Sequence, residues 1–120
     1  MALVLIVEED RDFSALVERV ITRQGHEVVT FADVQEALRW LEHNIPDVAI
    51  ISAGKHGEKA RELVPKLSSA GVETSSLILS TGIGSISHVQ RDFCDKVRSV
   101  IPKGSALEEL ERLVSSVSPG

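Results

Sequence analysis

Four short segments of the chain are almost continuously apolar and rich in β-branched residues. They span residues 4–7, 28–31, 48–51 and 77–79. A strand inside a parallel sheet is covered on both faces, so its apolar run is unbroken rather than alternating. The pattern therefore predicts four buried parallel strands. Residues 97–101 predict a fifth strand at an edge of the sheet, because two polar residues, Arg98 and Ser99, interrupt the run.

Between the strands, apolar residues recur at helical spacing and predict five helices. The first helix is expected to end at Gly25 and to bury one stripe of side chains. This stripe consists of Phe13, Leu16, Val17, Val20 and Ile21. Asp33 can cap the second helix by accepting hydrogen bonds from its first backbone N–H groups.

The three later helices are less regular in sequence. Pro65 must lie early in the third helix or kink it, because proline lacks the backbone N–H donor. The fourth helix is expected over about residues 87–96, with Cys94 as a small packing residue. Ser105 and Glu108 have the spacing of a capping box at the start of the fifth helix.

Five strand–helix units in strict succession predict an α/β fold with right-handed crossovers. We expect a flavodoxin-like (βα)5 three-layer sandwich with a parallel five-stranded sheet in the order 2-1-3-4-5. One domain should cover residues 1–120, with residues 118–120 as a tail or the start of a linker.

Composition and charge narrow the classes of function. The chain is 42% hydrophobic and 26% charged, which is typical of a soluble globular protein. Its net charge is −5 and its basic residues are scattered, which argues against direct binding of DNA or RNA. No apolar stretch approaches the roughly 20 residues needed to cross a membrane. A single cysteine suits a reducing compartment, so we expect a cytoplasmic protein.

Polar residues follow the predicted strands at the edge of the sheet where the strands end. They are Glu8, Glu9, Ser52, Thr81 and Lys103. In doubly wound folds, binding sites form at the carboxyl ends of the strands. Taken singly, each residue is an ordinary start of a loop. Their joint order predicts two carboxylates, two hydroxyl groups and one ammonium group at a common rim.

Around these positions the chain resembles bacterial response-regulator receiver domains, of the CheY-like superfamily. The similar segments are residues 4–10, 46–51, 78–82 and 101–103, and the resemblance covers essentially the whole chain. In that family an acidic pair holds Mg²⁺, an aspartate accepts a phosphoryl group, and a hydroxyl residue and a lysine contact its oxygens.

Carried over by position, the acidic pair is Glu8 and Glu9 and the lysine is Lys103. The hydroxyl residue is Thr81, a register favoured over Ser80 because Thr81 leads directly into a glycine. Where the family has its phosphorylated aspartate, this chain has a serine at position 52.

These departures imply a changed mechanism. A serine needs a base to become a nucleophile, whereas an aspartate is already ionised. With one carboxylate fewer, Lys103 is expected to pair with Glu8 or Glu9, and Mg²⁺ binding, with Glu9 as its candidate ligand, should be weak or absent. Val100 replaces the aromatic side chain that changes rotamer in the family. We therefore expect no cofactor.

The sequence thus predicts an atypical receiver domain of two-component signal transduction, a pseudo-receiver with no catalytic residue and no enzymatic activity. Its partner would be a histidine kinase, an output domain or a second copy, bound through the first, fourth or fifth helix, with no nucleic acid and no membrane. Two alternatives remain open. One is a working phosphoacceptor that uses Ser52 or Asp47, and the other is a small-ligand site at the rim, since such folds host unrelated functions.

Overall fold

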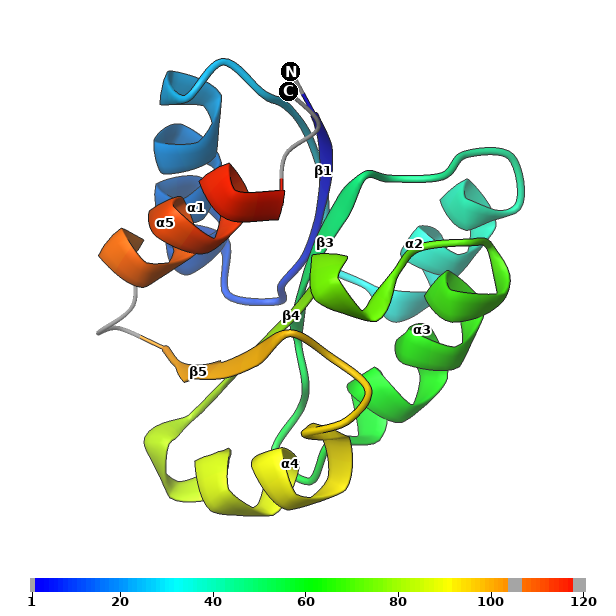
Figure 1. Ribbon diagram of the computed structural model, residues 1–120, viewed down its shortest axis with the longest axis vertical. Helices are drawn as coiled ribbons and strands as arrows, with labels where there is room; N and C mark the ends of the chain where they lie inside the picture. Colours follow the sequence, from blue (N-terminus) through cyan, green and yellow to red (C-terminus); the bar gives the residue numbers. More distant parts are fainter. Residues whose placement is uncertain (1, 104–106, 118–120) are drawn as a thin grey trace.

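The computed structural model describes residues 2–103 and 107–117, and its strands form one parallel sheet (Figure 1). The strands are β1 (Leu3–Val7), β2 (Glu27–Phe31), β3 (Val48–Ser52), β4 (Leu77–Thr81) and β5 (Ser99–Pro102). Their order is β2-β1-β3-β4-β5, and every neighbouring pair is parallel. The predicted flavodoxin-like fold and strand order are confirmed.

Helices cover both faces of this sheet and make a three-layer structure. They are α1 (Arg11–Arg23), α2 (Val34–Leu41), α3 (Glu58–Ser69), α4 (Ile86–Phe93) and α5 (Leu107–Val117), with short 3₁₀ turns η1 (Thr74–Ser76) and η2 (Ile83–Ser85). Figure 1 shows α1 and α5 together on one side of the sheet and α2 and α3 on the other. None of the described helices is long and apolar enough to cross a membrane.

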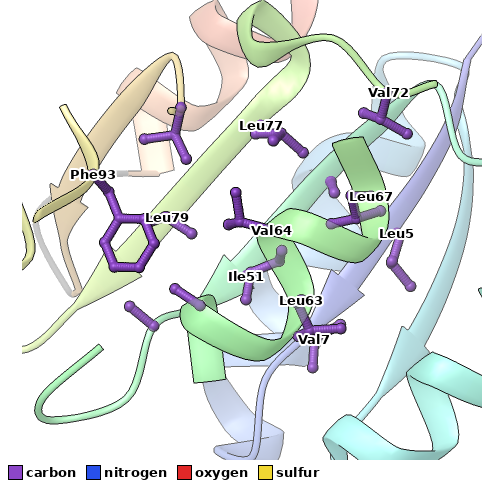
Figure 2. Packing of buried hydrophobic residues seen from close by; sticks show 14 of the residues in the cluster. Leu5, Val7, Ile51, Leu63, Val64, Leu67, Val72, Leu77, Leu79 and Phe93 are labelled. Atoms are coloured by element: carbon purple, nitrogen blue, oxygen red, sulfur yellow. The ribbon is translucent and has the colours of Figure 1, made fainter. Parts of the chain in front are cut away.

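Two hydrophobic clusters explain why the strands are apolar along their whole length. Leu5 and Val7 of β1 face the cluster beneath α2, α3 and α4, whereas Val4 and Ile6 face the cluster beneath α1 and α5. Successive side chains of a strand point to opposite faces, so both faces of each central strand need apolar residues. Figure 2 shows the first cluster, in which Leu63 and neighbouring side chains of α3 lie over the sheet.

A hydrogen-bonded contact joins the end of α1 to α5 in the second layer. The side-chain nitrogen of Gln24 donates to the carbonyl of Glu111 and to the hydroxyl of Ser115, both at 2.9 Å. Leu110 and Val114 of α5 are fully buried beside it. This contact closes the α1–α5 layer over β1.

Polar caps fix where the first two helices begin. Asp10 accepts hydrogen bonds from the backbone N–H groups of Asp12 and Phe13, which starts α1 directly after β1. Asp33 accepts from the N–H of Gln35 at 2.6 Å, which confirms the predicted cap of α2.

One expectation for the helices is wrong, and for Pro65 one of the two expected alternatives, an early position, is excluded. Leu16 was expected to face inward, but it is 45% exposed. At 100° per residue it lies about 140° around α1 from the fully buried Ile21, at the margin of the stripe. Pro65 is the eighth of the 12 residues of α3 rather than an early one. It is exposed, as is Arg61 one turn before it, so water can satisfy the carbonyl that proline leaves without a donor.

The end of α4 and the start of β5 also differ from their predicted positions. Helix α4 ends at Phe93, so Cys94 lies in the turn after it and is exposed rather than packed. Strand β5 begins at Ser99, two residues later than expected. The capping serine at position 105 and the tail at 118–120 lie outside the described residues.

Candidate functional site

The predicted polar residues meet at the carboxyl edge of the sheet. Four of them, Glu9, Ser52, Thr81 and Lys103, line a hollow of about 390 Å³, together with Lys55 and the glycines that follow β3 and β4. We call this hollow the rim pocket. The residues converge because β1, β3, β4 and β5 are parallel and end at the same edge.

The fifth residue, Glu8, is joined to the pocket through Lys103. Its side chain is only 2% exposed, and its Oε2 accepts from Lys103 Nζ at 2.9 Å and from the N–H of Asp10 at 3.0 Å. Its other oxygen, Oε1, is buried and has no hydrogen-bond partner among the described residues. A buried carboxylate is costly without a compensating charge. The predicted lysine–glutamate pair is therefore present, and it is made by Glu8.

A second ion pair lies beside the first. Lys59 Nζ, from the first turn of α3, contacts Glu9 Oε2. The lysine side chain is 23% exposed and the glutamate 60%, so water reaches this pair more freely. Lys59 is brought to the rim because the carbonyl of Ala53 accepts from the N–H groups of Lys59 and Ala60, which starts α3 at the end of β3.

Both hydroxyl groups at the rim are buried. Ser52 is 3% exposed and Thr81 is 2% exposed, and both residues line the rim pocket. Thr81 Oγ1 has no hydrogen-bond partner among the described residues. Ser80 was the alternative to Thr81 as the family's hydroxyl residue. It pairs with Ser52 across β3 and β4 but is not among the residues of the pocket wall.

Asp47, the alternative phosphoacceptor, and His56, the histidine nearest to Ser52 in sequence, lie outside the rim pocket. Asp47 is at the opposite edge of the sheet, where its carboxylate accepts from the N–H of Leu3 at 2.8 Å. His56 follows Ser52 closely in sequence, but its ring is exposed and packs edge-on against His88 of α4, with 6.4 Å between ring centres. Neither residue is part of the rim pocket.

A tight turn connects Ser52 to α3. Gly54 has φ +89°, and a Cβ there would lie 2.6 Å from the carboxyl carbon of Glu58. The Glu58 carboxylate accepts from the N–H of His56 at 2.9 Å. Hydrogen bonds from the backbone N–H groups of Glu58 and then of His56 lower the pKa of the Glu58 carboxyl below its ordinary value. The turn thus depends on a glycine and on an ionised carboxylate.

Residues 4–115, which include the whole rim, match the sequence model of one family, described as Response regulator receiver domain. The chain belongs to this family. Receiver domains are signalling modules of two-component systems, and they interact with proteins such as kinases and output domains. No curated protein matches this receiver domain significantly.

Solved structures share its fold at low sequence identity. A response regulator receiver protein from Burkholderia phymatum has a TM-score of 0.81 and 19% identity, and the alignment covers 98% of this chain and 94% of that one. A putative response regulator from Chloroflexus aurantiacus has a TM-score of 0.75 and 24% identity, over 97% and 96%. NtrX from Brucella abortus, in complex with ADP, has a TM-score of 0.77 and 19% identity, over 97% of this chain and 26% of that one.

The charges at this receiver domain's rim do not fit a magnesium site. Mg²⁺ prefers carboxylate and phosphate oxygens and keeps several waters. Here each carboxylate of the acidic pair is contacted by an ammonium group, Glu8 by Lys103 and Glu9 by Lys59. Lys55 adds a further positive charge to the pocket wall. No group of three or more His, Cys, Asp or Glu side chains that could hold a metal ion occurs among the described residues.

Val100, at the position of the receiver switch, is part of the core. It lies in β5, is 8% exposed and packs in the cluster beneath α4. A valine has two short branches fixed at one rotatable bond. It therefore offers no long side chain that could swing between the core and the surface.

Sequence reasoning missed two residues of the site, Lys55 and Lys59. Both lie after Ser52, in a connection and a helix end where hydrophobic periodicity gives no signal. The available signal was their position, because Lys55 and Lys59 lie in the connection after Ser52 and in the first turn of α3, next to the edge where β3 ends.

Proposed function

We propose that this receiver domain signals without being phosphorylated, by binding a protein partner. The observation that carries the proposal is the side chain at the end of β3. Ser52 lines the rim pocket, and in the sequence it stands where the family has its phosphorylated aspartate, so a hydroxyl replaces the carboxylate. An aspartate attacks a phosphoryl donor in its ionised form, whereas a serine must first give its proton to a base.

The surroundings of Ser52 support this proposal because they offer no such base among the described residues. Glu9 is the carboxylate of the pocket wall, and it is paired with Lys59. His56 packs against His88, outside the wall. A phosphoserine would also be a stable ester rather than a labile acyl phosphate, so the usual timed loss of the signal would not follow.

Incubation with acetyl phosphate and Mg²⁺, followed by intact-protein mass spectrometry, tests the proposal. We expect no adduct on the wild-type protein or on the matched variant Ser52→Ala. A receiver domain with an intact aspartate serves as the positive control. A stoichiometric gain of one phosphoryl mass on the wild type that is lost in Ser52→Ala would overturn the proposal.

The partner is proposed to be a histidine kinase, an output domain or a second copy, docked on α1, α4 or α5. Leu16 supports a role for α1, because it is a large apolar side chain that is 45% exposed on that helix. Sedimentation velocity of the wild type and Leu16→Glu would test self-association, with loss of a dimer in the variant as the expected result if a second copy is the partner.

The same proposal places the domain in a bacterial cytoplasm, where the exposed Cys94 stays reduced.

One observation favours a second candidate function, the binding of a small anion in the rim pocket. Thr81 Oγ1 is buried without a partner among the described residues, in a pocket that also presents Lys55 and Lys103. Thermal unfolding in the presence of inorganic phosphate would test it, with Thr81→Val as the matched variant. A ligand at 100 times its Kd stabilises by about 2.7 kcal/mol. An equal response of wild type and variant would count against the site.

A further inference from the structure

Lys59 lies where a cation is electrostatically disfavoured unless something compensates it. It is in the first turn of α3, close to the helix N-terminus, which carries a partial positive charge. Three quarters of its side chain is nevertheless covered, and its ammonium group contacts Glu9. The carboxylate of the acidic pair is therefore what holds this lysine at the rim.

If Lys59 and Lys103 were absent, the carboxylates of Glu8 and Glu9 would attract cations. Glu8 and Glu9 are adjacent in sequence and both reach the rim. Glu9 lines the rim pocket and its side chain is 60% exposed, so its carboxylate oxygens are within reach of a cation from solution. Oxygen ligands of this kind suit hard divalent cations. The ammonium group of Lys59, held beside these carboxylates, repels a divalent cation that approaches them.

We propose that Lys59 is a tethered substitute for a divalent cation. Its ammonium group neutralises Glu9, excludes Mg²⁺ from the acidic pair, and joins the end of β1 to the start of α3 without an exchangeable ion. The inference rests on the proposed function, because a domain that needs no phosphoryl chemistry needs no exchangeable cation.

Binding of Mn²⁺, a paramagnetic stand-in for Mg²⁺, tests this inference. The free ion is measured by electron paramagnetic resonance with wild type, Lys59→Met and Lys59→Arg at pH 7. We expect Lys59→Met to bind one Mn²⁺ with a Kd at least about tenfold lower than that of the wild type, because a repelling charge has been removed. Lys59→Arg keeps the charge and should exclude the ion as the wild type does.

Two further variants locate the effect. Lys66→Met removes a lysine from the last turn of α3, at the other end of that helix from Lys59, so it should leave Mn²⁺ binding unchanged. Adding Glu9→Gln to Lys59→Met should abolish the gained site. The inference is overturned if folded Lys59→Met binds no better than the wild type, or if the gain survives Glu9→Gln. Neither result bears on phosphorylation of Ser52, which the acetyl phosphate assay reports separately.

Discussion

The two ion pairs at the rim should differ in strength because they differ in burial. Glu8 is 2% exposed and Lys103 27%, whereas Glu9 is 60% exposed. Lys103→Met leaves the Glu8 carboxylate buried without its ammonium partner. Removing one partner of a fully buried pair costs about 3–5 kcal/mol. Because Lys103 is partly exposed, water can replace it in part, and we expect a loss of about 2–3 kcal/mol in the free energy of unfolding.

A double-mutant cycle isolates the interaction itself. In the Glu8→Gln background no charge is left behind, so Lys103→Met should cost less than about 1 kcal/mol, and the coupling energy should be about 1.5–2 kcal/mol. The matched cycle of Glu9→Gln and Lys59→Met should give about 0–1 kcal/mol, the range of exposed pairs.

Urea unfolding at pH 7 measures all of these variants. The fluorescence of Trp40 is a suitable probe, because this single tryptophan packs against Phe31 with 6.1 Å between ring centres. Addition of about 1 M NaCl should weaken the exposed pair and leave the buried one largely intact. Equal coupling energies for the two pairs, or a coupling below about 0.5 kcal/mol for Glu8 and Lys103, would refute the reasoning from burial.

Four further variants test the core, the surface of α1 and the turn after β3. Leu63→Ala empties a fully buried position and should cost about 2–5 kcal/mol in urea unfolding, whereas Leu16→Ala on the surface should cost less than about 1 kcal/mol. Gly54→Ala should cost about 1–2 kcal/mol, because φ is +89° and the new Cβ would displace the Glu58 carboxylate. The lowered pKa of Glu58 means that its ionised form stabilises the fold near neutral pH and that this contribution is lost as the pH falls through the folded-state pKa. The stability difference between wild type and Glu58→Gln should therefore shrink as the pH falls below the ordinary pKa of 4.5, and a constant difference would contradict the hydrogen bonds assigned to the carboxylate from the N–H groups of Glu58 and His56.

The strands could be predicted to within two residues because burial on both faces leaves an unbroken apolar run. Strand β3 was expected at 48–51 and ends one residue later, at Ser52. The buried faces of the helices were harder to predict, because the spacing of apolar residues does not show how far around the helix the buried surface extends. Leu16 belongs to the stripe by spacing, yet it lies beyond the surface that α1 buries. The end of α4 was equally hard to predict from the apolar pattern. The helix ends at Phe93 rather than near residue 96, and Cys94 is therefore exposed instead of packed.

The site was partly predictable because parallel strands place their following residues at one edge. That rule brought Ser52, Thr81 and Lys103 together. The lysine–glutamate pair followed instead from the charge balance of the receiver pocket, in which this chain has one carboxylate fewer. It could not supply Lys59, because the contact with Glu9 depends on how the connection after β3 turns into α3. Such a contact joins residues 50 positions apart and leaves no mark in local periodicity.

The contact between α1 and α5 has a consequence for biosynthesis. Helix α5 follows every strand in the sequence, yet its Leu110 and Val114 complete the cluster around Val4 and Ile6 of the first strand. On a translating ribosome, this side of the sheet stays open to water until α5 has left the exit tunnel. The domain is thus expected to complete its core late, only after α5 (Leu107–Val117) has emerged.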